Sequence, residues 1–286
     1  MMPKSKSSCN LSPGLPPAML ERGDGHKPRK EFGQNFLIDQ LVIEEIITAI
    51  NIKKDQTIIE IGPGLGAITT SIIANCAKLI AIEIDRDLFN KLTQKFQHAI
   101  SNNQLTIINQ DVLNIDFFSL LSPNHKARIV GNLPYNISTP LLFKLFGCSS
   151  LINDMHFLLQ KEVAERLGSA PNSKQYGRLS IMAQYHSKID TMFHVGAKSF
   201  NPVPKVESCM VRFVPHTILP VKANDYEHFY KLVTAAFCQR RKILSNSLKQ
   251  YCSASSLELL GVNPMARPEQ LSVADFVKIS NSLTLR

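Results

Sequence analysis

From residue 39 onward, short apolar runs alternate with amphipathic stretches. The first stretch, Asp39 to Ile50, carries apolar residues at helical spacing behind an aspartate that can cap a helix. We predict four strands next, at Thr57–Ile61, Leu79–Ile84, Leu105–Ile108 and Arg128–Val130. Each is followed by sequence that suits a helix, at Ala67–Ala74, Arg86–His98, Phe117–Leu121 and Pro140–Phe146. Strands spaced by helices indicate a parallel sheet with helices on both faces.

The strand signals continue to about residue 215 and then stop. A helix is predicted at Lys161–Leu167, and further strands at Asp154–Leu159, Thr191–Val195 and Glu207–Phe213. Beyond them the pattern predicts only helices, at Tyr226–Cys238, Ile243–Tyr251, Ser255–Leu260 and Val273–Leu283. We therefore expect an α/β domain over residues 29–217 and a small all-helical domain over 218–286. Residues 1–28 are rich in Ser, Pro and Gly without periodicity, which predicts a flexible tail.

Composition narrows the class of protein. The chain has 286 residues, of which 44% are hydrophobic and 19% charged, the balance of a globular protein. No apolar run approaches the roughly 18 residues of a membrane helix, and the first 25 residues lack the apolar segment of a secretory signal. The six cysteines form no C-x-x-C pair, and the histidines lack ligand spacing. We therefore expect a cytoplasmic protein without a metal site.

The net charge of +9 is concentrated at the two ends of the chain. Residues 1–30 hold six Lys and Arg against two Asp and Glu, and residues 216–286 hold nine against five, whereas the middle holds 17 against 16. A near-neutral middle between basic ends suits a small-molecule site whose surroundings bind a polyanion, most plausibly nucleic acid. Lysines that only increase solubility would give the same distribution.

A glycine-rich turn, Gly62-Pro63-Gly64-Leu65-Gly66, directly follows the first predicted strand. Glycines there let the backbone turn tightly and approach a bound cofactor. The spacing is G-x-G-x-G, whereas a site that binds the pyrophosphate of a dinucleotide typically has G-x-G-x-x-G. The turn therefore favours a nucleoside cofactor without phosphates over the nicotinamide cofactor of a dehydrogenase. An ordinary turn between a strand and a helix remains an alternative.

Acidic residues occur at the ends of the next two predicted strands, at the sheet edge that faces a ligand in this kind of fold. Glu83 can accept hydrogen bonds from both hydroxyl groups of a ribose, and Asp111 can accept one from an adenine amine. Asp85 is expected to begin the following helix instead. Each acid alone is more often a helix cap, but together at successive strand ends they favour a nucleoside site.

The segment Asn132-Leu133-Pro134-Tyr135 follows the fourth predicted strand and suits methylation of an exocyclic adenine nitrogen. The lone pair of that nitrogen is delocalised into the ring, so the amine must be held in a more tetrahedral geometry before it attacks. Asn132 Oδ1 and a backbone carbonyl near Leu133 can accept its two N–H bonds, and Tyr135 offers a face for a flipped base. A proline turn with a buried tyrosine is the alternative.

With these elements, the sequence resembles the bacterial small-subunit ribosomal RNA adenine dimethyltransferases, relatives of the erythromycin-resistance methylases. The match covers residues 29–286 and rests also on the segments Lys30–Leu37, Leu159–Ala164, Tyr176–Ser180, Phe200–Val206 and Phe237–Lys242. The resemblance implies a Rossmann-like, S-adenosylmethionine-dependent domain with a small helical C-terminal domain. It also implies dimethylation of two adjacent adenines near the 3′ end of 16S rRNA in the small (30S) ribosomal subunit.

The resemblance assigns roles to individual residues as well. Phe200 is implied to be a second aromatic that encloses the target base opposite Tyr135, and core packing is its alternative role. Gln34, Asn35 and Leu37 are implied to close over the methionine end of the cofactor. The full set of implied cofactor contacts is Gln34, Asn35, Leu37, Gly62, Gly64, Glu83, Asp111 and Asn132.

Basic residues near both ends of the match can bind RNA phosphates, which orients RNA without reading its sequence. The candidates are Arg29, Lys30, Lys205, Arg240, Arg241 and Lys242. A solvated surface is the alternative for each of them. The family usually has a basic residue where this chain has Glu31, which weakens the case for RNA contact at that position.

A non-enzymatic alternative is a ribosome-assembly factor that binds RNA and retains a methylase shell. Such a protein could keep the basic ends, but the presence of Glu83, Asp111 and Asn132 argues against lost activity. Because one catalytic and one RNA-binding domain account for the whole chain, we expect a monomer.

Overall fold

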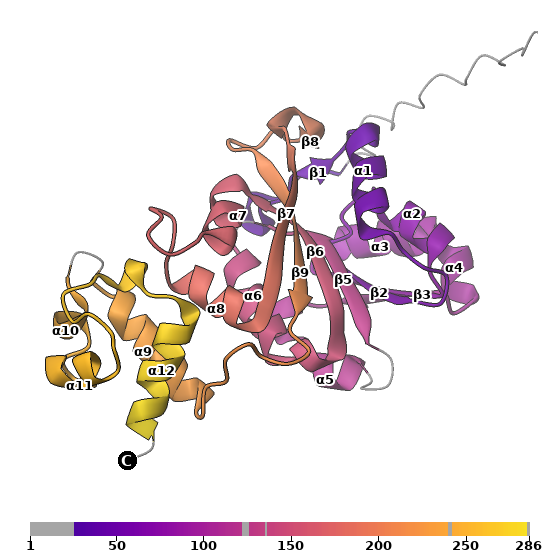
Figure 1. Ribbon diagram of the computed structural model, residues 1–286. Helices are drawn as coiled ribbons and strands as arrows, with labels where there is room; N and C mark the ends of the chain where they lie inside the picture. The colour runs from indigo at the N-terminus through magenta and orange to yellow at the C-terminus, as the bar shows by residue number, and fades with distance from the viewer. Residues whose placement is uncertain (1–25, 122–125, 135, 240–241, 285–286) are drawn as a thin grey trace, which may run out of the picture.

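The computed structural model describes residues 26–121, 126–134, 136–239 and 242–284. At its centre lies a seven-stranded sheet with helices on both faces, and helices from the end of the chain lie to one side (Figure 1). The prediction of an α/β fold followed by C-terminal helices is confirmed.

The strands of the sheet lie in the order β4-β3-β2-β5-β6-β9-β7. The five neighbouring strands β4, β3, β2, β5 and β6 are parallel as predicted. Strand β9 runs antiparallel to both β6 and β7. The prediction of a parallel sheet is therefore wrong at this edge. The residues between β7 and β9 are all described and form no crossover helix. The chain therefore turns back after β7, and β9 pairs with it in the antiparallel direction. The strands are β2 (Thr57–Ile61), β3 (Lys78–Glu83), β4 (Leu105–Asn109), β5 (Ala127–Asn132), β6 (Ile152–Gln160), β7 (Ser187–Val195) and β9 (Ser208–Pro215).

Two hydrophobic cores lie on the two faces of the sheet. Successive strand residues alternate between them, so that Ile58 belongs to one core and Ile59 to the other. Helices α1, α2 and α4 contribute to the core on the first face, and α5, α6 and α7 to the core on the second. The helices of this part are α1 (Gln40–Ile50), α2 (Thr69–Asn75), α3 (Arg86–Lys95), α4 (Gln97–Ser101), α5 (Phe117–Leu120), α6 (Ser138–Gly147), α7 (Lys161–Gly168) and α8 (Arg178–His186).

Helix α8 was not predicted from the sequence, although its first residues belong to one of the segments that carry the family resemblance. Its residues Ser180, Ile181, Met182, Ala183 and Tyr185 are all buried. Because these positions surround the helix instead of forming one stripe, the usual amphipathic signal is absent.

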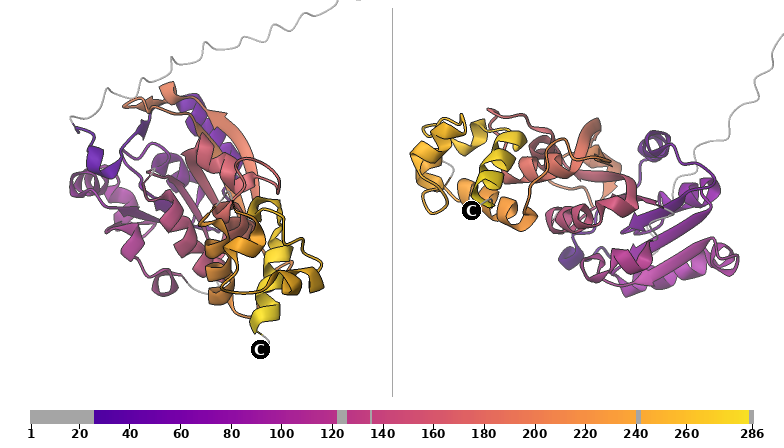
Figure 2. Two further views of the ribbon diagram at one scale, coloured as in Figure 1. Left: turned by 90° about the vertical axis from the view of Figure 1, so that its left-hand side faces the viewer. Right: turned by 60° about the horizontal axis from the view of Figure 1, so that its bottom comes forward.

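The C-terminal helices form a third hydrophobic core, which they share with α8. Ile181, Met182 and Tyr185 of α8 pack in it together with Phe229 and Leu232. Figure 2 shows this group at one end of the molecule, on the opposite side of the sheet from α2, α3 and α4. The predicted helix at Ile243–Tyr251 is much shorter than expected. The helices are α9 (Tyr226–Phe237), α10 (Leu244–Ser247), α11 (Ala254–Leu259) and α12 (Val273–Thr284).

A small antiparallel pair joins the two ends of the α/β part. Strand β1 (Phe36–Leu37) pairs with β8 (Phe200–Asn201), which places Leu37 opposite Phe200. Short 3-10 helices also occur, at Lys30–Phe32, Val112–Asn114, Ser149–Leu151, Ala197–Ser199 and Pro268–Gln270. Among the described residues, no helix is both long and apolar enough to cross a membrane.

Candidate active site

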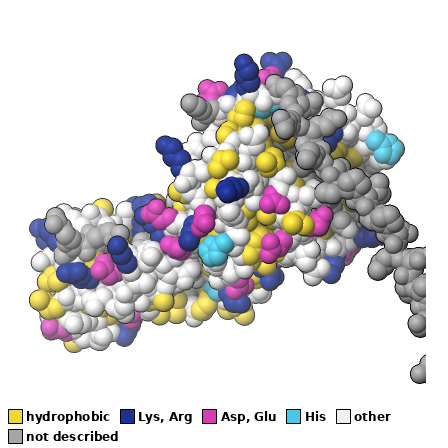
Figure 3. All heavy atoms as spheres, turned by 90° about the horizontal axis from the view of Figure 1, so that it is seen from above, with side chains coloured by type: hydrophobic (Ala, Val, Ile, Leu, Met, Phe, Trp, Pro, Cys, Tyr) yellow, Lys and Arg dark blue, Asp and Glu magenta, His cyan; other side chains and the backbone are white. Residues whose placement is uncertain are grey.

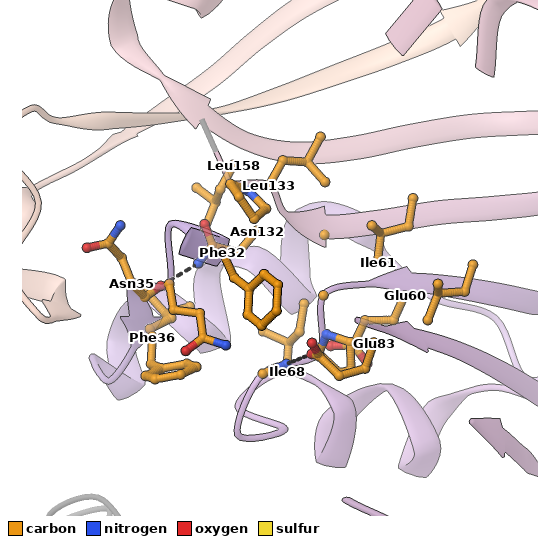
Figure 4. Close-up of a pocket in the computed structure, with 18 of the residues that line it drawn as sticks. Phe32, Asn35, Phe36, Glu60, Ile61, Ile68, Glu83, Asn132, Leu133 and Leu158 are labelled. Atoms are coloured by element: carbon orange, nitrogen blue, oxygen red, sulfur yellow. Dashed lines mark hydrogen bonds between the residues drawn. The ribbon is translucent and has the colours of Figure 1, made fainter. Parts of the chain in front are cut away.

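A cavity of about 330 Å³ lies at the carboxyl ends of the central strands. This is where open α/β sheets bind ligands, and the volume falls within the range of roughly 300–1,000 Å³ for small-molecule sites. Its walls come from the turns after β2, β3, β4 and β5 and from residues 31–37 (Figure 4). No Lys or Arg is among the described lining residues, which suits a cofactor without phosphates better than a dinucleotide.

The glycine turn after β2 forms one wall of the cavity. Gly62 and Gly64 have φ angles of 65° and 60°, in the left-handed region that favours glycine. A Cβ atom on Gly64 would lie only 3.0 Å from the ring of Phe36. The turn therefore needs glycine at residue 64 both for its backbone conformation and for its close packing.

Glu83, the last residue of β3, lies beside this turn and is 4% exposed. Its carboxylate accepts hydrogen bonds from the backbone N–H of Gly64 (3.2 Å) and of Asp85 (2.9 Å). Burial raises the pKa of Glu83 to about 7, although these hydrogen bonds act in the opposite direction. A buried acceptor at the cavity wall is therefore available to a ligand that brings hydroxyl donors.

The other two strand-end acids cap helices. Asp85 is fully buried and accepts from the N–H groups of Asp87 and Leu88, so it begins α3 as expected. Asp111 lines the cavity and accepts from Leu113 N–H (2.8 Å) through Oδ1. A contact between Asp111 and an adenine amine stays a prediction.

Asn132 is the last residue of β5 and lies across the cavity from Glu83 (Figure 4). Its Nδ2 donates to the backbone carbonyl of Asn35 at 2.9 Å, so Oδ1 is the acceptor that the amide can offer. The next residue, Leu133, is buried, and its backbone N–H donates to the Leu158 carbonyl. Pro134 lines the cavity, whereas Tyr135 lies outside the described residues.

The three residues expected to close over the cofactor lie at the cavity, but their side chains differ in role. Leu37 is buried, and the Asn35 side chain donates to the Gly33 carbonyl (3.1 Å). The Gln34 amide is turned toward protein partners. Its Oε1 accepts from the backbone N–H of Arg29 (2.8 Å), and its Nε2 donates to the Asp85 carboxylate (2.9 Å). A direct cofactor contact by these residues stays a prediction.

Phe200 lies in the wall of the same cavity and is only 2% exposed. It belongs to the core cluster of the first sheet face together with Leu37 and Met210. The core packing considered for this residue is therefore present. Stacking on a target base stays a prediction.

Two buried ionisable residues of the cavity wall were not identified from the sequence. Glu60 is 1% exposed, and its carboxylate accepts a hydrogen bond from Thr69 Oγ1 (2.7 Å). Its Oε1 has no hydrogen-bond partner among the described residues. Burial raises the pKa of Glu60 to about 8. Burial also lowers the pKa of His156 to about 4, so its ring is neutral. Both residues interrupt apolar strand runs, and such an interruption is the signal that could have identified them.

The candidate RNA contacts are only partly described. Arg29 forms an ion pair with Asp87 (2.5 Å), and Lys205 and Lys242 are exposed. Arg240, Arg241 and the side chain of Lys30 lie outside the description. Seen from above, Lys and Arg side chains are interspersed with acidic ones around a hydrophobic band (Figure 3). No group of three or more His, Cys, Asp or Glu suited to a metal occurs among the described residues.

The mixed seven-stranded sheet, with its cavity at the carboxyl ends, defines the class I S-adenosylmethionine-dependent methyltransferase fold. The model of the family "Ribosomal RNA adenine dimethylase" matches residues 25–285. This chain therefore belongs to the ribosomal RNA adenine dimethylase family, and the predicted enzyme class is confirmed.

Individual relatives agree with this assignment. The protein named "Ribosomal RNA small subunit methyltransferase A" in Vibrio parahaemolyticus is 49% identical to this chain over 259 residues (91% of this chain and 95% of the relative). The one in Pseudomonas fluorescens is 48% identical over 258 residues (90% and 94%). The crystal structure of a dimethyladenosine transferase from Plasmodium falciparum has a TM-score of 0.70 at 25% identity, covering 84% of this chain and 94% of that one. The 23S rRNA methyltransferase ErmE shares the fold with a TM-score of 0.66 at 22% identity, covering 87% and 100%.

Proposed function

We propose that this chain dimethylates N6 of two adjacent adenines near the 3′ end of 16S rRNA in the small (30S) ribosomal subunit or its precursor. The methyl donor is S-adenosylmethionine, and the reaction serves subunit biogenesis. The relatives' names support the substrate, since they are 46–49% identical over about 90% of this chain. The observation that carries the proposal is the position of Asn132 on the same cavity as Glu83.

The residues of the cavity fit this cofactor. The Glu83 carboxylate would accept hydrogen bonds from the ribose hydroxyls, Asp111 would accept one from the adenine amine, and the backbone at Gly62 and Gly64 would lie against the ligand. The absence of cationic side chains among the described lining residues matches a cofactor without phosphates. When bound, S-adenosylmethionine supplies a methyl group that its sulfonium already activates.

The work left to the protein is mainly to position the amine. Asn132 Oδ1 and a carbonyl near Leu133 accept hydrogen bonds from the two N–H groups of N6, which directs the nitrogen lone pair toward the methyl group. Tyr135 and Phe200 enclose the extruded base. Each transfer would replace one N–H bond of N6 by an N–C bond, with the proton released to water and S-adenosylhomocysteine as the leaving group. One N–H bond remains after the first transfer, so the Asn132 pocket must also hold a monomethylated nitrogen.

RNA is held by basic residues, among them Lys205, Lys242, Arg240 and Arg241. These contacts orient the RNA, and Asn132 acts on the base that is presented. We propose that the enzyme works in the cytoplasm as a monomer.

The direct test is methylation of small subunits that lack these methyl groups. The purified protein is incubated with them and labelled S-adenosylmethionine, and the modified nucleosides are located by mass spectrometry. Dimethyladenosine at two adjacent positions near the 16S 3′ end is expected. Methylation of large-subunit RNA instead would overturn the proposed substrate. Failure on both RNAs would favour the assembly factor that binds without catalysis.

A further inference from the structure

Residues 26–37 form a segment, here called the N-terminal strap, that runs into the wall of the cavity. Its residues 31–37 all line the cavity. Figure 4 shows Phe32, Asn35 and Phe36 on the side facing Glu83 and Asn132. The strap thus contacts both the cofactor end of the cavity and its reaction end.

The Gln34 side chain anchors this strap to the body of the protein. Nε2 donates to Oδ2 of Asp85 at 2.9 Å, and Oε1 accepts from the Arg29 N–H at 2.8 Å. The ring of His26 also lies within hydrogen-bond distance of Oε1, at 3.2 Å. Asp85 is a rigid anchor, because it is fully buried and caps α3. Both ends of the Gln34 amide are therefore engaged with protein groups.

The next residue along the strap contacts the reaction end. The backbone carbonyl of Asn35 accepts the hydrogen bond from Asn132 Nδ2 at 2.9 Å. Consecutive Cα atoms are about 3.8 Å apart, so a movement of Gln34 displaces this carbonyl. The orientation of the Asn132 amide, and hence the direction of its Oδ1, depends on where the strap holds residue 35.

We propose that Gln34 is a positioning residue for methyl transfer. By binding Asp85, it holds the Asn35 carbonyl where it keeps Asn132 Oδ1 directed at the target amine. This inference rests on the proposed function of Asn132. It differs from the direct cofactor contact that the family resemblance implies for Gln34.

The test separates catalysis from binding in the full-length Gln34→Ala variant. The expected result is a kcat on small subunits reduced about 10- to 100-fold, a range typical for misplaced reacting groups. The KM for the subunits and the calorimetric Kd for S-adenosylhomocysteine should change less than about threefold. The matched control is Gln40→Ala, because Gln40 is an exposed glutamine on α1 whose side chain donates to Glu44. A weakened Kd with an unchanged kcat at saturating cofactor would overturn the proposal.

Variants of Asp85 test the same contact from its other side. Asp85→Asn keeps the oxygen that caps α3 but places an N–H2 donor where Oδ2 accepts from Gln34, so its kcat should fall about as far as that of Gln34→Ala. Asp85→Ala should reduce kcat at least as much as Gln34→Ala does, because it also removes the cap of α3 and the ion pair with Arg29. A double variant that combines Gln34→Ala with Asp85→Asn should fall no further than either single variant, since both changes remove the same hydrogen bond. Multiplying effects would contradict the proposed route through this contact.

A spectroscopic measurement keeps this inference separate from the proposed function. If the wild type methylates no RNA, the function fails, yet the strap contact can still be observed by NMR. The side-chain amide resonances of Asn132 should shift and exchange faster with water in Gln34→Ala, but not in Gln40→Ala. Unchanged Asn132 resonances would refute the positioning role whatever the activity.

Discussion

The carboxylate of Glu83 at the end of β3 accepts a 3.2 Å hydrogen bond from the backbone of Gly64 in the turn after β2. Two adjacent βα turns are thereby tied together at the cavity. The acid and the turn thus form one unit, and a ligand that binds Glu83 also meets the glycine backbone.

The affinity for S-adenosylhomocysteine should depend on pH through Glu83. Burial raises its pKa to about 7 in the protein without ligand. Hydroxyl donors favour the ionised form, so binding lowers this pKa and releases a proton near neutral pH. Affinity should therefore rise from pH 6 to pH 8 and then level off. Calorimetry should show this rise for the wild type and for the exposed control Glu44→Gln, with weaker, pH-independent binding for Glu83→Gln.

The free energy of unfolding should decrease as the pH rises, because Glu60 is protonated in the folded protein. Its pKa is raised from 4.5 to about 8 in the folded protein, which therefore holds a proton that the unfolded chain releases between these values. Unfolding free energy then falls with rising pH in this range, by up to about 1.4 kcal/mol per pH unit for one proton. Urea unfolding at pH 6 and pH 8 should show a flatter dependence for Glu60→Gln than for the wild type or the exposed control Glu258→Gln. Equal slopes would show that Glu60 does not hold this proton.

Replacing Gly64 by alanine should destabilise the protein by about 1–3 kcal/mol. The residue has a φ of 60°, and the new Cβ would lie 3.0 Å from the Phe36 ring. Gly147→Ala is a suitable control, because a Cβ there meets nothing within 4 Å. Its stability should stay within about 1 kcal/mol of the wild type. Chemical denaturation measures both, and a neutral Gly64→Ala would show that the turn relaxes freely.

Phe200 can be tested for two roles separately. Phe200→Ala should lose about 3–5 kcal/mol of stability, because the residue is buried in a core. Phe200→Leu fills more of the space and should stay folded, so its methylation rate reports the need for an aromatic face. Phe157→Leu, in the core on the opposite face of the sheet, controls for lost packing alone. Full activity of Phe200→Leu would rule out essential stacking.

Asn132→Ala should reduce methyl transfer at least about 100-fold, since it removes the acceptor that positions the amine. Binding to small subunits should stay nearly intact, because the proposed RNA contacts lie elsewhere. Filter binding and label transfer measure the two quantities on one preparation. Equal loss of both would contradict this division of roles.

Much of the fold follows from local signals in the sequence. The strand Thr57–Ile61 was predicted with its observed bounds, and Asp39 and Asp85 cap helices as expected. Such features depend on residues within a few positions, so the sequence displays them directly. The positions of Glu83 and Asn132 at strand ends on one cavity follow from the same alternation of strands and helices.

Other features depend on distant partners and were not predicted. The antiparallel course of β9 is set by its neighbours β6 and β7, and the pairing of Leu37 with Phe200 joins segments about 160 residues apart. The contact between Gln34 and Asp85 is of the same kind. A pattern of polar and apolar positions carries no record of which partner a side chain finds, so these contacts required the structure.

The third hydrophobic core crosses the boundary that we propose at residue 217. Ile181, Met182 and Tyr185 of α8 are buried against residues of the C-terminal helices. A chain truncated after residue 217 would expose this apolar face to water, and such faces promote aggregation. We therefore expect the boundary to separate two patterns of sequence rather than two independent folding units. Heating should consequently melt both parts in a single cooperative transition, so the catalytic half and the helices that we propose to bind RNA are lost together.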